Sequence, residues 1–507
     1  MLDVVMILSL IVYILASVML MVYGVHLYVM LGLFYRKQKR CRAEIEKKID
    51  EFYVRNSAEY LPFVTIQLPV YNESDVVVRL IKSASEVDYP KNRFEIQVID
   101  DSTDDTVSII DKVMNEVREL NGVNIYAVRR ASREHFKAGA LSNALRYAKG
   151  EYVAIFDSDF IIPKNFLRRA IAQIHGDAGM ACIQGRWGHL NRYENWLTKA
   201  QSIGIDGHFA AEQGARSYNN LCMNFNGTAG VWRVSAIAAA GGWSGDTLTE
   251  DLDLSYRVQL AGYKISYDFD LVCLAELPNN IMALKSQQKR WAKGSVETAI
   301  KLMPDIVKSR TLSVGQKLEA FIHLTHYSVS LLMVILAIFT LPVLLLVPKL
   351  SVGIFLPIIW MVIIISALAP CTLYTGCGML HKKGIFSLTH FPAMLAVGTG
   401  LCVNNALAVI EAILGNKTEF VRTPKSGSSD TDRRKARYKV GMRILPAVFE
   451  VVLGIYCAYT FFVYVGSSKY VFGFFIGAYA FGLIIFGSET LLRFFSATLF
   501  RRKTATA

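Results

Sequence analysis

The nine residues 152–160, "YVAIFDSDF", decide how the central part of this chain folds. An apolar run ends directly in two aspartates, Asp157 and Asp159, which is the pattern of a buried strand with polar side chains at its carboxyl end. Strands that alternate with helices predict an α/β domain with a mostly parallel sheet. Such alternation surrounds this run, with strand patterns at 63–70, 94–101 and 124–130 and amphipathic helical patterns at 75–87, 106–120 and 138–148.

Composition predicts that other parts of the chain lie in a membrane. Hydrophobic residues make up 53% of the 507 residues and charged residues only 19%, a balance typical of an integral membrane protein. The formal net charge is +13, but the basic residues cluster beside apolar segments instead of forming a stripe with interleaved aromatics. We therefore expect a lipid bilayer, and no nucleic acid, as their partner. The eight cysteines include no CxxC pair, which indicates reduced packing residues.

Long apolar segments lie on both sides of the central part. A basic segment at 36–48 places the adjoining side of the membrane in the cytoplasm. One apolar segment, 388–414, contains Asn404, Asn405 and Glu411, and placing it in the interface keeps the basic loops around it cytosolic. We therefore expect five spans plus an interfacial helix rather than six spans. The expected spans are 4–34, 323–347, 353–375, 444–466 and 470–488.

The expected organisation is a cytosolic domain inserted between transmembrane helices of a multi-pass protein. The membrane is the plasma (inner) membrane, or a Golgi membrane in a eukaryote. Asn404, Asn405 and Glu450, which lie inside apolar segments, either line a channel or make hydrogen bonds between helices. The expected parts are a transmembrane helix at 1–35, the α/β domain at 36–310, an interface helix and two transmembrane helices at 311–376, an interfacial helix and cytosolic loop at 377–443, and two transmembrane helices with a basic tail at 444–507.

Acidic residues at strand ends are the first candidates for a binding site. The spacing of Asp157 and Asp159 lets both carboxylates reach one point at the edge of the sheet, where a hard divalent cation takes oxygen ligands. Ligands of open α/β sheets bind outside the carboxyl ends of the strands. We favour a site for a cation and a diphosphate over helix capping for this pair. Asp100 and Asp101 end another strand, and the same two interpretations apply to them.

Glu250 and Asp251 directly precede an amphipathic helical pattern. Helix capping with Thr249 is one interpretation, and a general base that takes a proton from an attacking hydroxyl is the other. The pattern does not choose between the two acids. Lys137, at a predicted helix start, suits a phosphate group, although a solvated lysine is the simpler alternative.

Two further segments carry residues suited to a sugar nucleotide. Small residues fill 224–233, "NFNGTAGVWR", so Gly227 and Thr228 allow a ligand close to the backbone, although a tight turn explains the segment almost as well. The segment 287–291, "QQKRW", offers Arg290 as a planar donor to phosphate oxygens and Trp291 as a stacking surface for a sugar ring. With the acids, these residues indicate glycosyl transfer from a nucleotide sugar.

Eight motifs in this order resemble those of the processive glycosyltransferases of family 2, and most closely the cellulose synthase-like mannan and glucan synthases of groups A and C. The resemblance covers about residues 60–305 and implies a GT-A fold and an inverting, single-displacement transfer at the cytosolic face. Thr249 and Ser295 differ from the usual group A pattern, which leaves donor and acceptor specificity open. The motifs are "QLPVYNE" (67–73), "IDDSTD" (99–104), "KAGAL" (137–141), "FDSDF" (156–160), "FNGTAGVWR" (225–233), "AGGW" (240–243), "TED" (249–251) and "QQKRW" (287–291).

The resemblance also implies roles for individual residues. Asp251, next to Glu250, corresponds to the catalytic base that deprotonates the 4-hydroxyl of the acceptor. Nucleotide binding is implied for Tyr71, Glu73, Asp100, Asp101, Lys137, Asp157 and Arg290, and Mg²⁺ or Mn²⁺ binding for Asp157 and Asp159. Acceptor binding is implied for Gln287, Gln288, Trp291, Gly227 and Thr228, and a gating loop for Phe420, Arg422, Thr423 and Lys425.

The function expected from these residues is polymerisation of a β-1,4-linked hexose polysaccharide, which is a mannan, a glucomannan or a glucan. GDP-mannose or UDP-glucose is the expected donor, and the growing polysaccharide is the acceptor that crosses the membrane. The alternative is a non-processive membrane enzyme that adds a single sugar to a lipid. The sequence leaves the donor and the oligomeric state open.

Overall fold

A computed structural model of the chain describes residues 2–57, 60–346, 355–380, 389–416, 444–467 and 470–505. The residues of the predicted gating loop lie outside this described part; they are Phe420, Arg422, Thr423 and Lys425.

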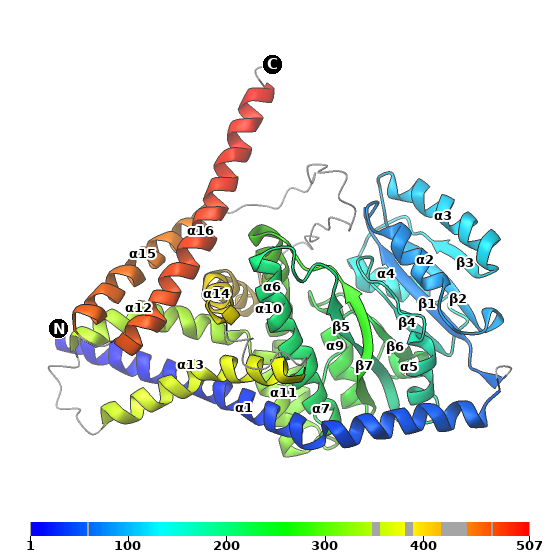
Figure 1. The fold of residues 1–507 in the computed structure, drawn as a ribbon, viewed down its shortest axis with the longest axis horizontal. Coiled ribbons are helices and arrows are strands. Elements are labelled where there is room, and N and C mark those ends of the chain that lie inside the picture. The colour runs from blue at the N-terminus through cyan, green and yellow to red at the C-terminus, as the bar shows by residue number, and fades with distance from the viewer. Residues whose placement is uncertain are drawn as a thin grey trace.

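A seven-stranded sheet forms the centre of the α/β domain (Figure 1). The strand order is β3-β2-β1-β4-β6-β5-β7, and β6 alone runs antiparallel to its neighbours. The predicted α/β fold with a mostly parallel sheet is therefore confirmed. The strands are β1 (Val64–Val70), β2 (Phe94–Asp100), β3 (Asn124–Val128), β4 (Tyr152–Ile155), β5 (Met180–His189), β6 (Gly230–Arg233) and β7 (Lys264–Ala275).

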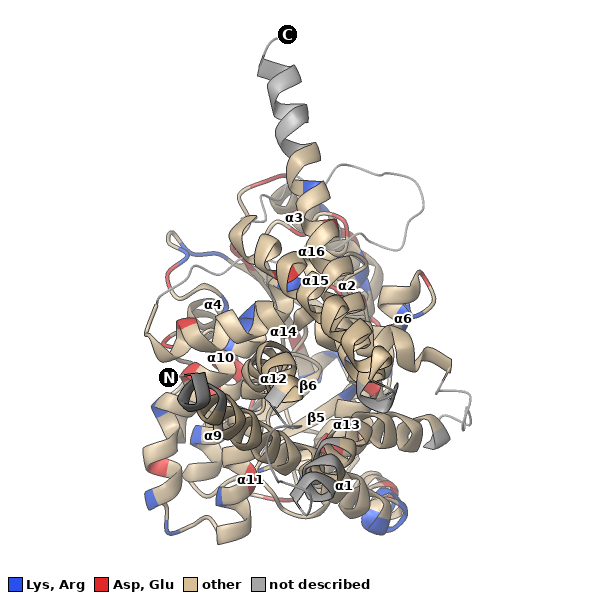
Figure 2. Cartoon of the chain, turned by 90° about the vertical axis from the view of Figure 1, so that its left-hand side faces the viewer, with Lys and Arg blue, Asp and Glu red and all other residues tan. Residues whose placement is uncertain are grey.

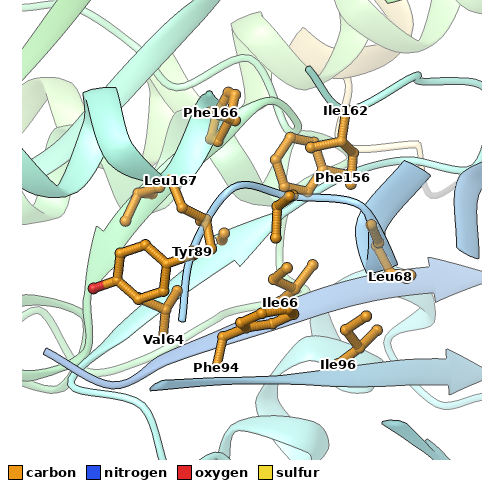
Figure 3. Close-up of a cluster of buried hydrophobic side chains, with 14 of the residues drawn as sticks. Val64, Ile66, Leu68, Tyr89, Phe94, Ile96, Phe156, Ile162, Phe166 and Leu167 are labelled. Carbon is orange, nitrogen blue, oxygen red and sulfur yellow. The ribbon is translucent and has the colours of Figure 1, made fainter. Parts of the chain in front are cut away.

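Helices cover both faces of the sheet, which explains the unbroken apolar run in β4. Alternate residues of β4 enter different clusters: Tyr152 and Ala154 pack on one face, and Val153 and Ile155 on the other. Figure 3 shows the first cluster, in which Ile66 of β1 and Ile96 of β2 lie near Phe156. Helices α2 (Val77–Ser85), α3 (Thr106–Asn121) and α5 (Phe166–Ile174) contribute to this face, and α4 (Phe136–Leu145), α8 (Val234–Ala239) and α9 (Glu250–Leu260) to the other, while η2 (Lys91–Arg93) precedes β2.

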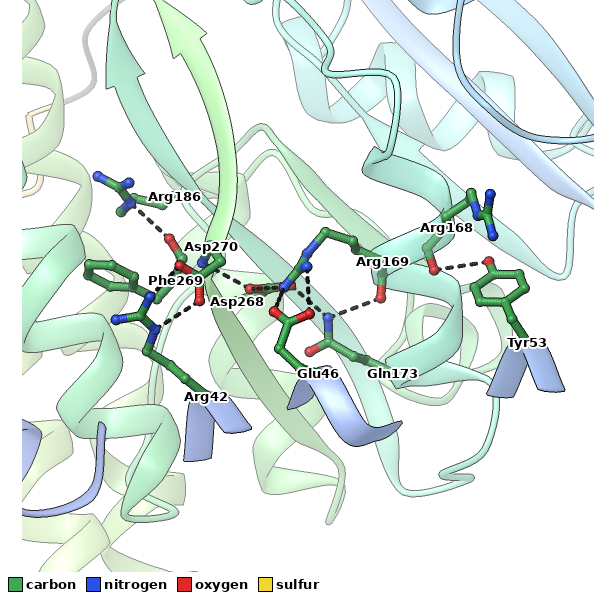
Figure 4. A network of polar contacts seen from close by, with 10 residues as sticks. All are labelled: Arg42, Glu46, Tyr53, Arg168, Arg169, Gln173, Arg186, Asp268, Phe269 and Asp270. Carbon is green, nitrogen blue, oxygen red and sulfur yellow. Dashed lines mark hydrogen bonds and ion pairs between the residues drawn. The ribbon is translucent and has the colours of Figure 1, made fainter. Parts of the chain in front are cut away.

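Helix α1 (Leu2–Arg55) is a continuous helix of 54 residues that extends beyond the predicted boundary at residue 35. Its second half lies along the α/β domain (Figure 1). Arg42 pairs with Asp270 at 2.6 Å, and Arg169 bridges Glu46 of α1 (2.7 Å) to Asp268 of β7 (3.0 Å), as Figure 4 shows. These ion pairs hold the C-terminal half of α1 against the domain.

The chain connects this domain to a bundle of apolar helices. Figure 2 shows that the helices nearest the viewer carry few charged residues. The connecting elements are α6 (Trp196–Asp206), the π-helix η3 (Gly207–Gln213), α7 (Gly214–Tyr218), α10 (Ile281–Lys308) and α11 (Val314–Thr325). The bundle contains α12 (Ser328–Leu346), α13 (Phe355–Leu380), α14 (Phe391–Ile413), α15 (Ile444–Gly466) and α16 (Tyr470–Ala505).

Among the described residues, five helices are long and apolar enough to cross a membrane: α1, α12, α14, α15 and α16. Helix α13 contributes a shorter apolar stretch, Ile364–Gly378. Helix α14 differs from the others in burial, because 61% of its apolar window is buried in the protein against 28% to 39% elsewhere. It is also seen almost end-on in Figure 1, where α1, α12 and α13 lie across the view, so α14 crosses these helices.

Candidate active site

A cavity of about 210 Å³ opens where the parallel strands β1, β2 and β4 end. It is lined by residues that follow these strands, by the loop before β6, by the start of α9 and by α10. This is the position that ligands occupy in open α/β sheets. The predicted site residues that line it are Tyr71, Glu73, Asp101, Lys137, Asp157, Asp159, Gly227, Glu250, Asp251, Gln287, Arg290 and Trp291.

Three predicted residues do not line the cavity. Asp100 is buried behind it, where its carboxylate accepts hydrogen bonds from Arg129 Nε at 2.8 Å and from the backbone N–H of Ser102 at 3.0 Å. Thr228 holds the backbone of the site, since its Oγ1 accepts a hydrogen bond from the backbone N–H of Asp157 at 2.8 Å. Gln288 follows Gln287 on α10, and one helical residue turns the side chain about 100° away.

Lys137 connects the two groups of acids. Its Nζ lies 2.6 Å from Asp157 Oδ1 and 3.9 Å from Glu250 Oε1, and it donates to the carbonyl oxygen of Gly227 at 2.9 Å. A Cβ placed on Gly227 would lie 2.9 Å from Asp251 Oδ2. One ammonium group is therefore the meeting point of β4, α4, the loop before β6 and α9. A side chain at position 227 would collide with the carboxylate of Asp251.

Glu250 and Asp251 are the first two residues of α9, and Asp251 Oδ1 accepts a hydrogen bond from the backbone N–H of Leu252 at 2.9 Å. Thr249, the N-cap residue, makes no side-chain capping hydrogen bond, so the capping alternative for this motif is wrong. Burial, together with the negative charge of Glu250, raises the pKa of Asp251 to about 7. Burial lowers the pKa of Arg290, while four carboxylates oppose that change; they are Glu250, Asp157, Asp251 and Asp159. Asp251 is thus a carboxyl group that can exchange a proton near neutral pH.

Two arginines contact Asp101 and Tyr71, which line the cavity. Arg130 binds Asp101 with two nitrogens, at 2.8 and 2.7 Å, and the guanidinium of Arg133 lies 3.3 Å from the ring centroid of Tyr71. The sequence analysis did not identify these arginines. Their side chains place positive charge beside the cavity at the end of β2, where a phosphate-containing ligand needs it.

The cavity has an aromatic wall that is formed by two tryptophans. Trp291 and Trp187 both line it, with ring centroids 6.4 Å apart and planes tilted by 53°. Trp187 stacks on Phe209 of η3 at 4.9 Å and meets the edge of Phe160 at 5.4 Å. Sequence analysis found Trp291 but missed Trp187, which lies on β5. The signal was present in the "QGRWGH" run, whose position beside the site depends on the pairing of β5 with β7.

His189 and Asn226 are further lining residues that sequence analysis missed. Asp206 contacts His189 Nε2 at 3.1 Å and also accepts from Arg192 at 2.6 Å, so the imidazole is held in place. The Asn226 side chain contacts Gln213 at 2.6 Å and His208 at 3.2 Å, both from the π-helix η3. Short π-helical segments occur often at functional sites. Here the segment supports the loop that carries Gly227.

The sheet has acids at its carboxyl edge, and two tryptophans line the same cavity. This arrangement defines a GT-A glycosyltransferase domain, which is joined to apolar helices long enough to span a membrane. Residues 65–237 match the model of glycosyl transferase family 2, and residues 152–374 match that of glycosyl transferase family group 2. The chain belongs to glycosyl transferase family 2, in its cellulose synthase-like branch, and is a glycosyltransferase.

Its relatives include plant enzymes of similar length. A probable glucomannan 4-beta-mannosyltransferase 7 of Oryza sativa subsp. japonica is 34% identical over 445 residues, which are 85% of this chain and 74% of that protein. Glucomannan 4-beta-mannosyltransferase 9 of Arabidopsis thaliana is 31% identical over 493 residues, 93% of this chain and 89% of that one. The mannosyltransferase PcManGT from Pyrobaculum calidifontis, solved in complex with GDP-Man and Mn²⁺, shares the fold: the TM-score is 0.50 at 18% identity, over 78% of this chain and 100% of that chain.

Proposed function

We propose that the chain polymerises a β-1,4-linked mannan or glucomannan from GDP-mannose at the cytosolic face of a membrane. The observation that carries the proposal is one cavity that Asp157, Asp159, Lys137, Asp251 and Trp291 line together. Relatives named glucomannan 4-beta-mannosyltransferases, at 31% and 34% identity, favour mannose as the transferred sugar and a 4-linked product.

In this proposal Asp251 acts as the general base. Its Oδ2 is close to the backbone of Gly227, so an acceptor hydroxyl can approach there without a side chain in the way. Deprotonated Asp251 takes the proton of the acceptor 4-hydroxyl, whose oxygen then forms a bond to the anomeric carbon while the bond from that carbon to the diphosphate breaks. Attack opposite the leaving group inverts an α-linked donor into a β-linked product.

The residues present fit a divalent cation shared with the donor. Asp157 and Asp159 line one cavity as hard oxygen donors, and Mg²⁺ is typically bound by one or two carboxylates together with substrate phosphates. Among the described residues no group of three or more His, Cys, Asp and Glu side chains is placed to hold a metal ion. A Mg²⁺ or Mn²⁺ ion held by these two aspartates would neutralise charge on the departing diphosphate. Lys137, Arg290 and Arg133 then hold the diphosphate itself.

Acceptor binding is proposed for the aromatic wall. A sugar ring fits against Trp291 and Trp187, and α10, which carries Trp291, packs against the apolar helix α14. Helix α14, which crosses the other helices and is the most buried of the apolar ones, is proposed to lie in the membrane interface. The remaining spans would then carry the growing chain across the membrane.

Donor and product are tested together with purified protein in detergent micelles. Radiolabelled GDP-mannose and UDP-glucose are offered separately, with Mg²⁺ or Mn²⁺. We expect a long polymer from GDP-mannose and less or none from UDP-glucose. A single-sugar glycolipid supports the non-processive alternative, and transfer from UDP-glucose alone contradicts the mannose assignment.

A further inference from the structure

Helix α10 presents two different sides to the rest of the molecule. Gln287, Arg290 and Trp291 line the cavity. Lys285, Lys289 and Lys293 are spaced four residues apart, so they form one row along the helix. At 100° per residue this lysine row lies roughly opposite the side that lines the cavity.

Each lysine of the row contacts a membrane-associated element. Lys285 Nζ lies 2.5 Å from Glu450 Oε2 of α15 and donates to Thr490 Oγ1 of α16 at 2.9 Å. Lys289 Nζ lies 2.8 Å from Glu411 Oε1 of α14. Lys293 donates to the carbonyl oxygen of Asn416, just after the end of α14.

Neighbouring polar groups strengthen the first of these contacts. The Asn404 side chain donates to the carbonyl oxygen of Lys285 at 3.0 Å and to Asn405 Oδ1 at 3.0 Å. Glu450 and Asn404 therefore make interhelical hydrogen bonds, one of the two roles expected for them from the sequence, while Asn405 accepts its bond from Asn404 within α14. They tie the first turns of α10 to α14 and α15.

Burial shows what the Lys285–Glu450 pair contributes. The two side chains are 9% and 1% exposed. Removing two charges from water costs about as much as their attraction returns, so an apolar pair of similar volume would be about as stable. An ion pair with further hydrogen-bond partners is, however, more directional than an apolar contact. The Nζ of Lys285 contacts Glu450 and Thr490 at the same time, and one orientation of the helix allows both contacts. The pair thus fixes the rotation and axial position of α10.

We propose that the lysine row is a positioning device for the acceptor: Lys285, Lys289 and their partners Glu450 and Glu411 hold α10 so that Gln287, Arg290 and Trp291 face the cavity in register with the membrane helices. The inference rests on the proposed polymerase function, because it concerns the side of the site that binds the growing chain. The donor contacts at the strand ends, Asp157, Asp159 and Lys137, lie outside α10, and Arg290 is the one proposed diphosphate contact that this helix carries.

The test replaces the buried pair as a unit. The double variant Lys285→Met, Glu450→Met removes both charges and leaves neither buried alone, so it keeps the fold. Wild-type and variant protein, purified in the same detergent, are compared for the KM of the donor, the rate of polymer formation and the mean polymer length. We expect the rate of polymer formation to fall by about tenfold or more, because a small displacement of a binding group costs that much. We expect the donor KM to rise by a smaller factor, because Arg290 is the one proposed donor contact on α10. Lys308→Met, an exposed lysine on the same helix, is the matched control.

The outcomes separate this inference from the proposed function. Polymer of wild-type length, formed at the wild-type rate by the double variant, overturns the inference. An equal loss in the Lys308→Met control also overturns it. Failure of the wild-type protein to form polymer instead contradicts the proposed function. The wild-type protein is therefore assayed before any variant. Thermal unfolding of the double variant close to that of wild type is expected and excludes a general loss of folding as the cause.

Discussion

Asp251 is the residue on which the chemistry of the site depends most. Burial and the charge of Glu250 raise the pKa of this carboxyl to about 7, well above that of an exposed aspartate. Only the deprotonated form can act as a base, so kcat/KM should rise about tenfold per pH unit below about pH 7 and level off above it. A pH profile measured with GDP-mannose checks this. Activity that stays constant down to about pH 5 contradicts the assignment.

The choice between the two acids is tested by a matched pair of variants. Asp251→Asn keeps the shape of the side chain but removes the base, so the rate of transfer should fall by at least about 100-fold. Glu250→Gln should reduce the rate less and should lower the pH at which activity rises, because the negative charge next to Asp251 is gone. If Glu250→Gln abolishes transfer while Asp251→Asn retains it, the roles are reversed.

Gly227 is predicted to be irreplaceable for a steric reason. Its φ is +81°, and a Cβ would lie 2.9 Å from Asp251 Oδ2. Gly227→Ala should therefore reduce transfer by about 100-fold through displacement of the base. Gly122→Ala is the control, since Gly122 has a φ of +61° and no atom within 4 Å of an added Cβ. Both variants should lose about 1–2 kcal/mol of stability from the left-handed backbone, but only the first should lose activity.

Local sequence patterns predicted the site residues that stand at strand ends and in short motifs. Asp157 and Asp251 could be found because the apolar run before one and the helical pattern after the other are visible in neighbouring residues. Asp100 does not line the cavity because its carboxylate is bound by Arg129, which directly follows β3, and a contact that depends on strand pairing is not visible in neighbouring residues. Trp187 was missed for a similar reason, since its strand reaches the cavity only through pairing with β7.

At the scale of elements, β5 and α10 meet through the tryptophan pair. Trp291→Leu should abolish polymer formation while donor binding persists. Trp187→Leu should lower the rate of polymer formation by about tenfold, the effect of about 1.4 kcal/mol of lost stacking. Donor binding by isothermal titration calorimetry and polymer length by gel filtration check both. Trp196→Leu, an exposed tryptophan at the start of α6, is the control. Wild-type polymer from Trp291→Leu contradicts the acceptor assignment.

Most strands and helices of the domain follow from hydrophobic periodicity, but two elements do not. The extension of α1 to Arg55 depends on ion pairs with Asp270 and Arg169 that are far away in the sequence. The π-helix η3 continues directly from α6 to α7, and its hydrogen-bond pattern leaves no mark in the order of residue types. Elements stabilised by tertiary contacts are those that sequence patterns describe least well.

At the scale of the whole molecule, a series of buried polar side chains joins the apolar half of α1 to the catalytic domain. His26 of α1 contacts Glu319 of α11 at 2.6 Å, and Glu319 accepts a hydrogen bond from Arg216 of α7 at 2.8 Å. The side chains of Arg216 and Glu319 are 2% and 4% exposed. Helix α1, a candidate membrane span, is therefore also part of the structure that supports the site.

From the contacts of Glu319 we predict that one substitution has a large effect on stability. Glu319→Leu leaves the charge of Arg216 with less compensation, so the free energy of unfolding should fall by about 3–5 kcal/mol. Thermal unfolding of the purified protein in detergent measures the change. Glu119→Gln on the surface of α3 should leave the unfolding temperature unchanged. An unchanged unfolding temperature for Glu319→Leu would show that the buried network contributes little.

The central claim is that one cavity builds a β-1,4-linked mannan chain, and the product itself tests it most directly. Polymer made by the purified protein from radiolabelled GDP-mannose is subjected to linkage analysis and to digestion by an endo-acting β-1,4-mannanase. The account predicts a long, 4-linked chain that the mannanase degrades completely and that the Asp251→Asn variant does not make. A product of one mannose on a lipid, or a polymer that resists the mannanase, would contradict it.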